Sequence, residues 1–259
     1  MLLAIDIGNS LTHIGMFYKD ELLGTDRFSS SSANPAESLN HTLDSLLFRI
    51  HSNRTAIHSC GICSVVPRLT DILAQWVNTN LKRSPLIVTG MLPLGIQIQY
   101  DEPESLGADR ICTAIAAFKK YGGPAIIIDF GTATTYDVIS EHGDFMGGVI
   151  APGIKTAGDA LTRGTAQLPS VELTFPQEII GNSTISCIQS GILYGGLDAA
   201  EGMIKRLKQI TGSRTVVIAT GGLGKLMASN SKQINHYDEH LLLEGVKLIF
   251  ERCGKETVR

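Results

Sequence analysis

The sequence has little that would suit a nucleic acid or a membrane. No cluster of lysine and arginine occurs along its 259 residues, and the formal net charge is −3. We therefore expect no nucleic acid or membrane as the main partner, and a small molecule instead. No stretch approaches the roughly 20 apolar residues of a membrane span, and Asp6 interrupts the first apolar run too early for a signal sequence. A cytoplasmic protein is expected.

Cysteine is scarce as well, and its number is odd. The five cysteines lie mostly in apolar contexts, as reduced core thiols do. Cys60 and Cys63 have the CxxC spacing of zinc and redox sites, but the sequence has no second CxxC that would complete four ligands. Strand packing is therefore favoured over metal binding for this pair.

Two familiar nucleotide-binding motifs are absent. No GxxxxGK[ST] loop occurs, and no GxGxxG follows the first apolar run. The P-loop and dinucleotide-binding families are therefore excluded. Any phosphate site in this chain must be built in another way.

What the sequence does contain is an alternation of apolar runs that predicts strands and helices. Asn34, Pro35 and Glu37 have the spacing of a helix start, with a cap, a proline and an acidic residue in the first turn. The other expected elements are strands at 2–7, 14–18, 56–66, 86–89 and 215–220 and helices at 68–78 and 239–252. This alternation predicts an α/β fold with a largely parallel sheet, and a last helix that covers a second sheet.

One short motif occurs twice, about half the chain apart. Asp6 and Gly8 follow one apolar strand, and Asp129 and Gly131 follow another with the same spacing. The repeat indicates a duplicated chain in which both acidic turns serve one nucleotide site. We place the boundary in the glycine-rich turn before Pro124. The predicted domains are residues 1–122 and residues 123–259.

The Asp6 turn suits a phosphate and a magnesium ion. Gly8 permits a tight turn, Asn9 and Ser10 can donate hydrogen bonds to phosphate oxygens, and Asp6 can hold a hydrated Mg²⁺. A single turn of this kind is more often an ordinary hairpin, because these residue types favour turns anyway. Two copies of the turn at half-chain spacing favour a phosphate-binding role over an ordinary hairpin. His13, nearby, is interpreted as a strand residue rather than a catalyst.

Asp109 and Arg110 stand at the predicted start of another helix. In the simplest interpretation, Asp109 complements the helix dipole and Arg110 points to water. In the functional one, Asp109 orients and finally deprotonates an alcohol, and Arg110 balances an anionic substrate or the transferring phosphoryl group. Because Asp109 stands at a helix start, we expect it to act late and mainly as a positioning group.

Two glycine-rich segments are predicted to be turns between a strand and a helix. They are Gly147–Gly153 and Ala219–Gly224. Glycine there would allow close approach of a ligand, and the second segment would suit the adenosine end of ATP. Such turns are equally often structural.

These motifs, taken in order, resemble those of the type III pantothenate kinases, and the resemblance spans almost the whole chain. They are Asp6 to Ser10, Gly107 to Arg110, Asp129 to Ala133 and Gly147 to Gly153, followed by Leu168-Pro169 and Gly181 to Thr184. That family belongs to the acetate and sugar kinase, chaperone and actin superfamily. The resemblance therefore implies two duplicated ribonuclease-H-like (actin-like ATPase) domains.

The resemblance implies ATP-dependent phosphorylation of the 4′-hydroxyl of pantothenate, the first step toward coenzyme A. Asp109 would be the general base, Asp129 the ligand of a monovalent cation (K⁺ or NH₄⁺), and Thr132 an ATP contact. The phosphate-binding turn would comprise Asp6, Ile7, Gly8, Asn9, Ser10, Leu11, Thr12 and His13. Pantothenate contacts would be Tyr100, Gly107, Ala108, Asp109, Arg110 and Thr184. Family members are typically homodimers with the substrate site near the interface, which would suit Thr184 arriving from a partner chain.

Two alternatives stay open. A regulatory or accessory protein on the same scaffold would bind nucleotide, or nothing, without phosphorylating pantothenate. A sugar or acetate kinase is disfavoured because the chain is short for one. The pair Cys60 and Cys63 departs from the small residues expected there, and suggests sensitivity to thiol oxidation.

Overall fold

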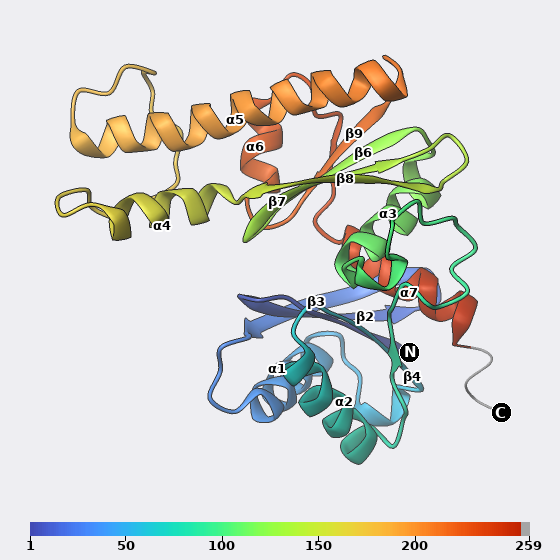
Figure 1. Ribbon diagram of the computed structural model, residues 1–259. Helices are drawn as coiled ribbons and strands as arrows, with labels where there is room; N and C mark the ends of the chain where they lie inside the picture. Colours follow the sequence, from blue (N-terminus) through green and yellow to red (C-terminus); the bar gives the residue numbers. More distant parts are fainter. Residues whose placement is uncertain (255–259) are drawn as a thin grey trace. The chain divides into compact units, whose positions relative to one another are not determined.

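The structure is a computed structural model that describes residues 1–254, which fold as two compact units (Figure 1). Of the described residues, the first unit contains Met1–Lys119 and residues 240–254, and the second contains Lys120–Glu239. The division differs from the predicted domain limits, because it falls inside a helix and returns the last helix to the first unit. None of the helices within residues 1–254 has the length and apolar character needed to cross a membrane.

The first unit is built on a five-stranded mixed sheet of order β3-β2-β1-β4-β5. Its strands are β1 Leu2–Ile7, β2 Leu11–Tyr18, β3 Glu21–Ser29, β4 Ser59–Ser64 and β5 Leu86–Ile87. The first three strands pair antiparallel, whereas β4 and β5 continue the sheet in parallel with β1. The prediction of a largely parallel sheet is therefore wrong. Short turns join successive strands here, and a short turn can join only antiparallel neighbours.

Helices cover both faces of this first sheet. They are α1 Pro35–Arg49, α2 Pro67–Leu81, α3 Ala108–Tyr121 and α7 Leu241–Cys253, with short 3₁₀ helices at Arg54–Ala56 and Pro103–Ser105. Helix α1 begins as predicted, because the Asn34 side chain accepts a hydrogen bond from the Glu37 amide at 3.3 Å and Pro35 opens the helix. Inward residues of β1 and β4 form one hydrophobic core with α1 and α2.

The last helix, α7, packs on the first sheet and not on the second. It contacts β1, β2 and β4 (Figure 1). A Cβ added to Gly15 would lie 3.0 Å from the Leu243 side chain, and one added to Gly61 would lie 2.8 Å from Val246. The prediction that this helix covers the second sheet is therefore wrong. Apolar periodicity identifies a buried helix face but not the sheet that buries it.

The second unit repeats the plan of the first. Its sheet has the order β10-β9-β6-β7-β8, with two antiparallel and two parallel pairings in the same places. The strands are β6 Ala125–Phe130, β7 Ala133–Ile139, β8 Phe145–Pro152, β9 Val216–Thr220 and β10 His236–Tyr237. The central strands β1 and β6 are those that end in the repeated Asp-x-Gly motif, so the predicted duplication is confirmed.

Helices α4 Ile154–Gly164, α5 Thr184–Thr211 and α6 Gly224–Asn230 complete the second unit. Helix α4 lies beside α5, and both extend past the end of the sheet (Figure 1). Ala219–Gly224 is a strand-to-helix turn, as predicted. All of Gly147–Gly153 except its last residue is instead part of β8, and Gly153 is the N-cap of α4. The sequence did not predict this strand, because glycines interrupt the apolar pattern of β8 and its residues are alternately exposed.

Candidate functional site

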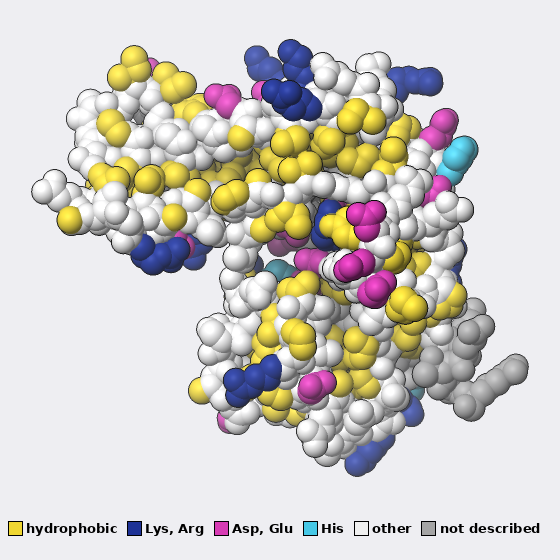
Figure 2. Space-filling model, in the orientation of Figure 1, with side chains coloured by type: hydrophobic (Ala, Val, Ile, Leu, Met, Phe, Trp, Pro, Cys, Tyr) yellow, Lys and Arg dark blue, Asp and Glu magenta, His cyan; other side chains and the backbone are white. Residues whose placement is uncertain are grey.

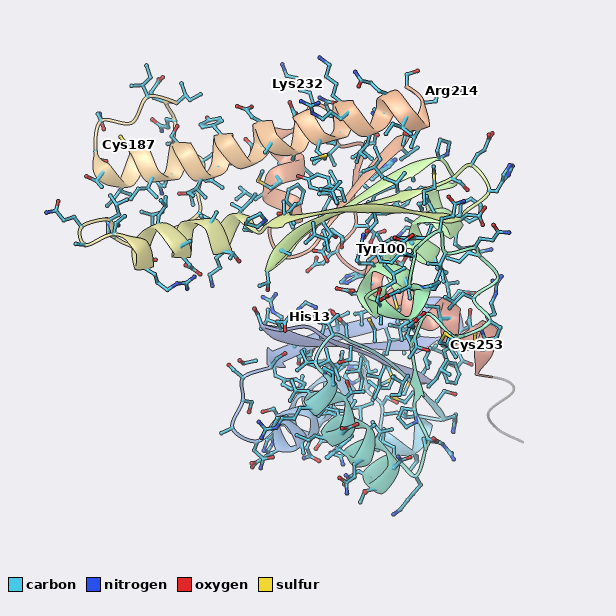
Figure 3. The ribbon with its side chains drawn as sticks, in the orientation of Figure 1. His13, Tyr100, Cys187, Arg214, Lys232 and Cys253 are labelled. Atoms are coloured by element: carbon cyan, nitrogen blue, oxygen red, sulfur yellow. The ribbon has the colours of Figure 1, made fainter. Side chains whose placement is uncertain are left out.

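The hairpin of β1 and β2 presents the Asp6 turn. The amide of Gly8 donates a hydrogen bond to the Leu11 carbonyl at 3.1 Å, which closes the turn and leaves Asn9 and Ser10 exposed. The Asp6 side chain is 14% exposed, and its Oδ2 atom lies 3.7 Å from Nδ1 of His13 on the paired strand β2. His13 is labelled in Figure 3. The turn therefore offers a carboxylate and exposed hydrogen-bond donors side by side.

Some residues of the predicted phosphate turn face inward. Ile7 belongs to the hydrophobic core, and Thr12 is buried with its Oγ1 atom 2.9 Å from Oγ of Ser30. Leu11 is exposed at 39%. Any contact that Ile7 or Thr12 makes with a phosphate must therefore come from the backbone, whose amide groups suit that role.

Asp109 lies in the first turn of α3. Its Oδ1 atom accepts a hydrogen bond from the Arg110 amide at 2.8 Å, and Thr113 Oγ1 donates to the Asp109 carbonyl at 3.1 Å. The carboxylate lies against Gly107, where an added Cβ would overlap Oδ1. Glycine at 107 thus lets the carboxylate settle over the start of the helix. Ala108, between them, is buried.

Arg110 is buried rather than directed to water. The residue is only 7% exposed. Its Nη1 atom lies 3.4 Å from the Tyr100 hydroxyl, and its guanidinium lies 5.8 Å from the centre of the Tyr100 ring. The simplest interpretation of Arg110, as a solvated charge, is therefore wrong. A buried guanidinium beside an aromatic ring is held in one orientation, as an anion-binding group must be.

Asp6 and Asp109 both lie close to one buried thiol. Cys63 on β4 is the register partner of Asp6 on β1. The pKa of Cys63 is raised well above its usual value by a hydrogen bond with Cys112, by burial, and by the charges of Asp6 and Asp109. The two carboxylates that the sequence singled out therefore occupy the same region of the first unit.

The CxxC pair does not act as a pair. Strand β4 places Cys60 in the core formed with α1 and α2, and burial strongly raises the pKa of its thiol. Cys63 lies on the opposite face, because residues three apart on a strand point to opposite sides. Within residues 1–254, no three His, Cys, Asp or Glu side chains gather as a metal site would require.

In the second unit, Asp129 lies beside a glycine turn that follows another strand. Asp129 at the end of β6 pairs in register with Thr220 at the end of β9. Gly221 has φ +84°, and a Cβ there would overlap Oδ1 of Asp129. Only glycine suits both conditions. Sequence reasoning found both motifs but did not predict that they meet.

Thr132 and Thr184 also belong to the second unit. Thr132 is exposed, and its carbonyl accepts hydrogen bonds from Oγ1 of Thr156 at 2.6 Å and from the Gly153 amide at 3.2 Å. Thr184 is the exposed first residue of α5, next to Ser183, whose side chain caps that helix. Both threonines therefore stand at element ends, where a side chain can reach a ligand.

Solved structures of other proteins share this fold at low sequence identity. The putative 2-dehydro-3-deoxygalactonokinase from Sinorhizobium meliloti matches with a TM-score of 0.60 and 15% identity, covering 97% of this chain and 99% of that one. The (R)-2-hydroxyglutaryl-CoA dehydratase component A from Acidaminococcus fermentans matches with a TM-score of 0.59 and 11% identity, covering 100% and 99%. The fold is thus that of duplicated ribonuclease-H-like domains of the actin-like ATPase type.

Sequence comparison gives a narrower result. The model of the family "Type III pantothenate kinase" matches residues 2–206. The type III pantothenate kinase of Moorella thermoacetica is 40% identical over 252 residues, covering 97% of this chain and 99% of that protein. That of Agathobacter rectalis is 36% identical over 260 residues, covering 100% of both. The chain therefore belongs to the type III pantothenate kinase family, whose members are phosphotransferases that phosphorylate pantothenate in coenzyme A biosynthesis.

Proposed function

We propose that this chain transfers the γ-phosphoryl group of ATP to the 4′-hydroxyl of pantothenate, with Asp109 as the general base. One observation supports this assignment most strongly. The Asp109 carboxylate lies at the start of α3, next to the buried Arg110 and close to the same thiol as Asp6. A base, a cation and a second carboxylate for the nucleotide are the groups that transfer of phosphate to an alcohol requires.

Each of these groups has a distinct part in the reaction. The pantothenate hydroxyl oxygen forms a bond to the γ-phosphorus while the bond from that phosphorus to the bridging oxygen of ADP breaks. Asp109 orients the hydroxyl and takes up its proton as the new bond forms. Arg110, held by Tyr100, faces the negative charge of the substrate or of the transferring group. Gly107 and Ala108 contribute the amides at the start of α3.

The donor set of the Asp6 turn fits Mg²⁺ carried by ATP. In nucleotide sites, Mg²⁺ keeps several waters and is held by one or two carboxylates together with phosphate oxygens. Asp6 supplies a partly exposed carboxylate for this purpose, and Asn9 and Ser10 are exposed beside it. Bound Mg²⁺ would neutralise part of the charge on the β- and γ-phosphates. We assign the Asp6–His13 turn to the phosphates on this basis.

We assign the monovalent cation to Asp129, with Thr132 as an ATP contact. The Asp129 carboxylate lies against the Gly221 turn, so backbone groups as well as a charge surround that position. Oxygen atoms of a carboxylate and of backbone carbonyls are suitable ligands for K⁺ or NH₄⁺. Replacing Asp129 by alanine should therefore abolish any stimulation of turnover by K⁺, and an unchanged response to K⁺ would contradict the assignment.

We further propose that the enzyme is a cytoplasmic homodimer formed through the region around Thr184. Apolar side chains are exposed there, with Ile179 at 62%, Ile180 at 85% and Ile185 at 52%. Figure 2 shows hydrophobic side chains gathered where α4 and α5 extend past the sheet. Such a patch favours association with a second copy of the chain.

A coupled assay of ADP release tests the proposed reaction. Purified protein is incubated with ATP and Mg²⁺, with and without pantothenate, in K⁺ and separately in Na⁺. We expect ADP release that depends on pantothenate and is faster in K⁺. If folded protein binds ATP but releases no ADP in either salt, the regulatory alternative replaces the proposed function.

A further inference from the structure

An acidic side chain, an imidazole and a guanidinium lie in one row across the first sheet. Asp6 on β1 pairs in register with His13 on β2, and His13 pairs in register with Arg27 on β3. Residues that pair directly on neighbouring strands point to the same face of a sheet. Arg27 therefore shares a face with the carboxylate that we assign to Mg²⁺, two strands away from it.

The residue before Arg27 shows which face this is. Asp26 pairs in register with Ile14, which belongs to the core formed with α1 and α2. The Oδ2 atom of Asp26 lies 3.0 Å from Nη1 of Arg49 on α1. Asp26 therefore faces α1, and Arg27, the next residue of the strand, faces the opposite side, where Asp6 lies.

The Arg27 guanidinium is open to a ligand. Arg27 is exposed, and among residues 1–254 its side chain forms neither an ion pair nor a hydrogen bond. His13 stands between Arg27 and Asp6 in the row, and it is His13 that lies 3.7 Å from the Asp6 carboxylate. Arg49, by contrast, is paired with Asp26. Arg27 is thus a cation beside the Asp6 turn that no carboxylate of the described chain neutralises.

The end of β3 is joined to the Asp6 turn. The Ser30 amide donates a hydrogen bond to the Ser10 carbonyl at 3.0 Å, and the Ser30 hydroxyl lies 2.9 Å from that of Thr12. These bonds hold the strand that carries Arg27 against the turn. The position of the Arg27 backbone relative to the turn is therefore fixed.

Arg27 and the proposed base lie on opposite sides of Asp6. The sheet has the order β3-β2-β1-β4-β5, so β3 and β5 are its two edges. Helix α3, which carries Asp109, lies near β5, because a Cβ added to Gly90 after that strand would lie 3.7 Å from the Ile111 side chain. In phosphoryl transfer the attacking and leaving oxygens are roughly in line across the phosphorus. With the alcohol at Asp109, Arg27 lies on the side of the departing ADP.

We propose that Arg27 binds the β-phosphate of the nucleotide and stabilises the charge on departing ADP, an inference that rests on the proposed function. The alcohol oxygen bonds to the γ-phosphorus as the bond from that phosphorus to the β–γ bridging oxygen breaks. Asp109 takes the hydroxyl proton, and ADP keeps the bridging oxygen with its electron pair. A guanidinium can donate two hydrogen bonds to such oxygens. Residues 6–13 include no lysine or arginine, so β3 supplies the cation.

The test measures nucleotide affinity by calorimetry, on full-length protein with Mg²⁺ present. Arg27→Gln removes the charge, and Arg27→Lys keeps the charge but loses the planar fork. Lys19→Gln is the matched control, because it removes the same charge at the exposed turn between β2 and β3, at the other end of that hairpin. ADP and AMP are titrated separately, since AMP has no β-phosphate. Thermal unfolding shows whether each variant is folded.

We expect Arg27→Gln to bind ADP about tenfold more weakly than the native protein, because hydrogen bonds between charged groups are lost. Arg27→Lys should recover part of this affinity. AMP should bind all variants equally, and Lys19→Gln should bind ADP like the native protein. In the ADP-release assay, Arg27→Gln should lower kcat by about tenfold or more without changing KM for pantothenate.

Four results overturn the proposal: unchanged ADP affinity in folded Arg27→Gln, an equal loss of affinity in Lys19→Gln, an equal loss for AMP, or an unchanged kcat. Calorimetry requires no phosphoryl transfer, so the two proposals can fail separately. If the native protein releases no ADP with pantothenate while Arg27→Gln weakens ADP binding, the proposed function fails and the phosphate contact of Arg27 stands.

Discussion

Asp109 is positioned by the residue two places before it in the chain. Its Oδ1 atom occupies the space that a side chain at Gly107 would fill, and it accepts a hydrogen bond from the Arg110 amide at 2.8 Å. This hydrogen bond fixes the carboxylate over the helix start. The conformation of the proposed base is therefore set locally, by a few consecutive residues.

Replacing Gly107 by alanine should lower turnover by about a hundredfold, because the new Cβ overlaps Oδ1 and displaces the carboxylate. ATP affinity should stay the same, since the Asp6 turn is untouched. Steady-state kinetics and calorimetric ATP titration measure the two effects. Gly158→Ala in α4 is the control, because a Cβ there has no neighbour within 4 Å. Equal turnover in both variants would show that Gly107 does not position the base.

The sequence identified the acidic residues but not all of their neighbours. Asp6, Asp109 and Asp129 each stand at the end of a strand or the start of a helix, where residue type and local order predict their place. From the sequence, Arg110 could equally point to water or bind the substrate, and only the packing of the structure shows that it is buried. The effect of Cys112 on the pKa of Cys63 could not be predicted either, since it depends on tertiary packing between α3 and β4.

At the scale of elements, local sequence signals predict where a helix or turn begins, whereas tertiary contacts decide which sheet a helix packs on. The Asn34 cap and the turn at Gly8 are short-range features, and both elements begin where the sequence indicates. The sheet that buries α7 is chosen by long-range fit: glycines in β2 and β4 leave room for its side chains. A single sequence carries no direct signal for such a choice.

Replacing Leu243 by alanine tests the placement of α7. Leu243 is 5% exposed and packs beside Gly15, so its truncation should cost about 2–5 kcal/mol of unfolding free energy. Hydrogen exchange should rise in β1, β2 and β4 and stay unchanged in β6 and β9. Ile210→Ala, at a position 77% exposed on α5, should change neither quantity. Faster exchange confined to β6 and β9 would assign α7 to the second sheet.

At the scale of the whole molecule, duplication explains why the chain has two acidic turns. Each unit has the same strand order, and in each the central strand ends in Asp-x-Gly. The two copies differ in their surroundings: Asp6 lies beside His13 and precedes a turn with exposed Asn9 and Ser10, whereas Asp129 lies against the Gly221 turn. This difference supports separate roles, with phosphate and Mg²⁺ at the first and a monovalent cation at the second.

Association through the region around Thr184 has a direct test. Charges introduced together as Ile180→Asp and Ile185→Asp should separate the chains, because both side chains are at least half exposed in one copy. Sedimentation equilibrium should give twice the chain mass for the native protein and the single mass for the variant. Ile210→Asp, at the other end of α5, is the control. A native monomer, or a double variant that still dimerises, would refute this interface.

Turnover by Asp109→Asn, measured beside its ATP affinity, tests the central claim most directly. Asparagine keeps the shape of the side chain but cannot accept the hydroxyl proton. We predict a fall in kcat of about a hundredfold or more, with unchanged ATP binding, because the base acts only on the alcohol. Turnover close to that of the native enzyme would contradict the role of Asp109, at the start of α3, as the general base.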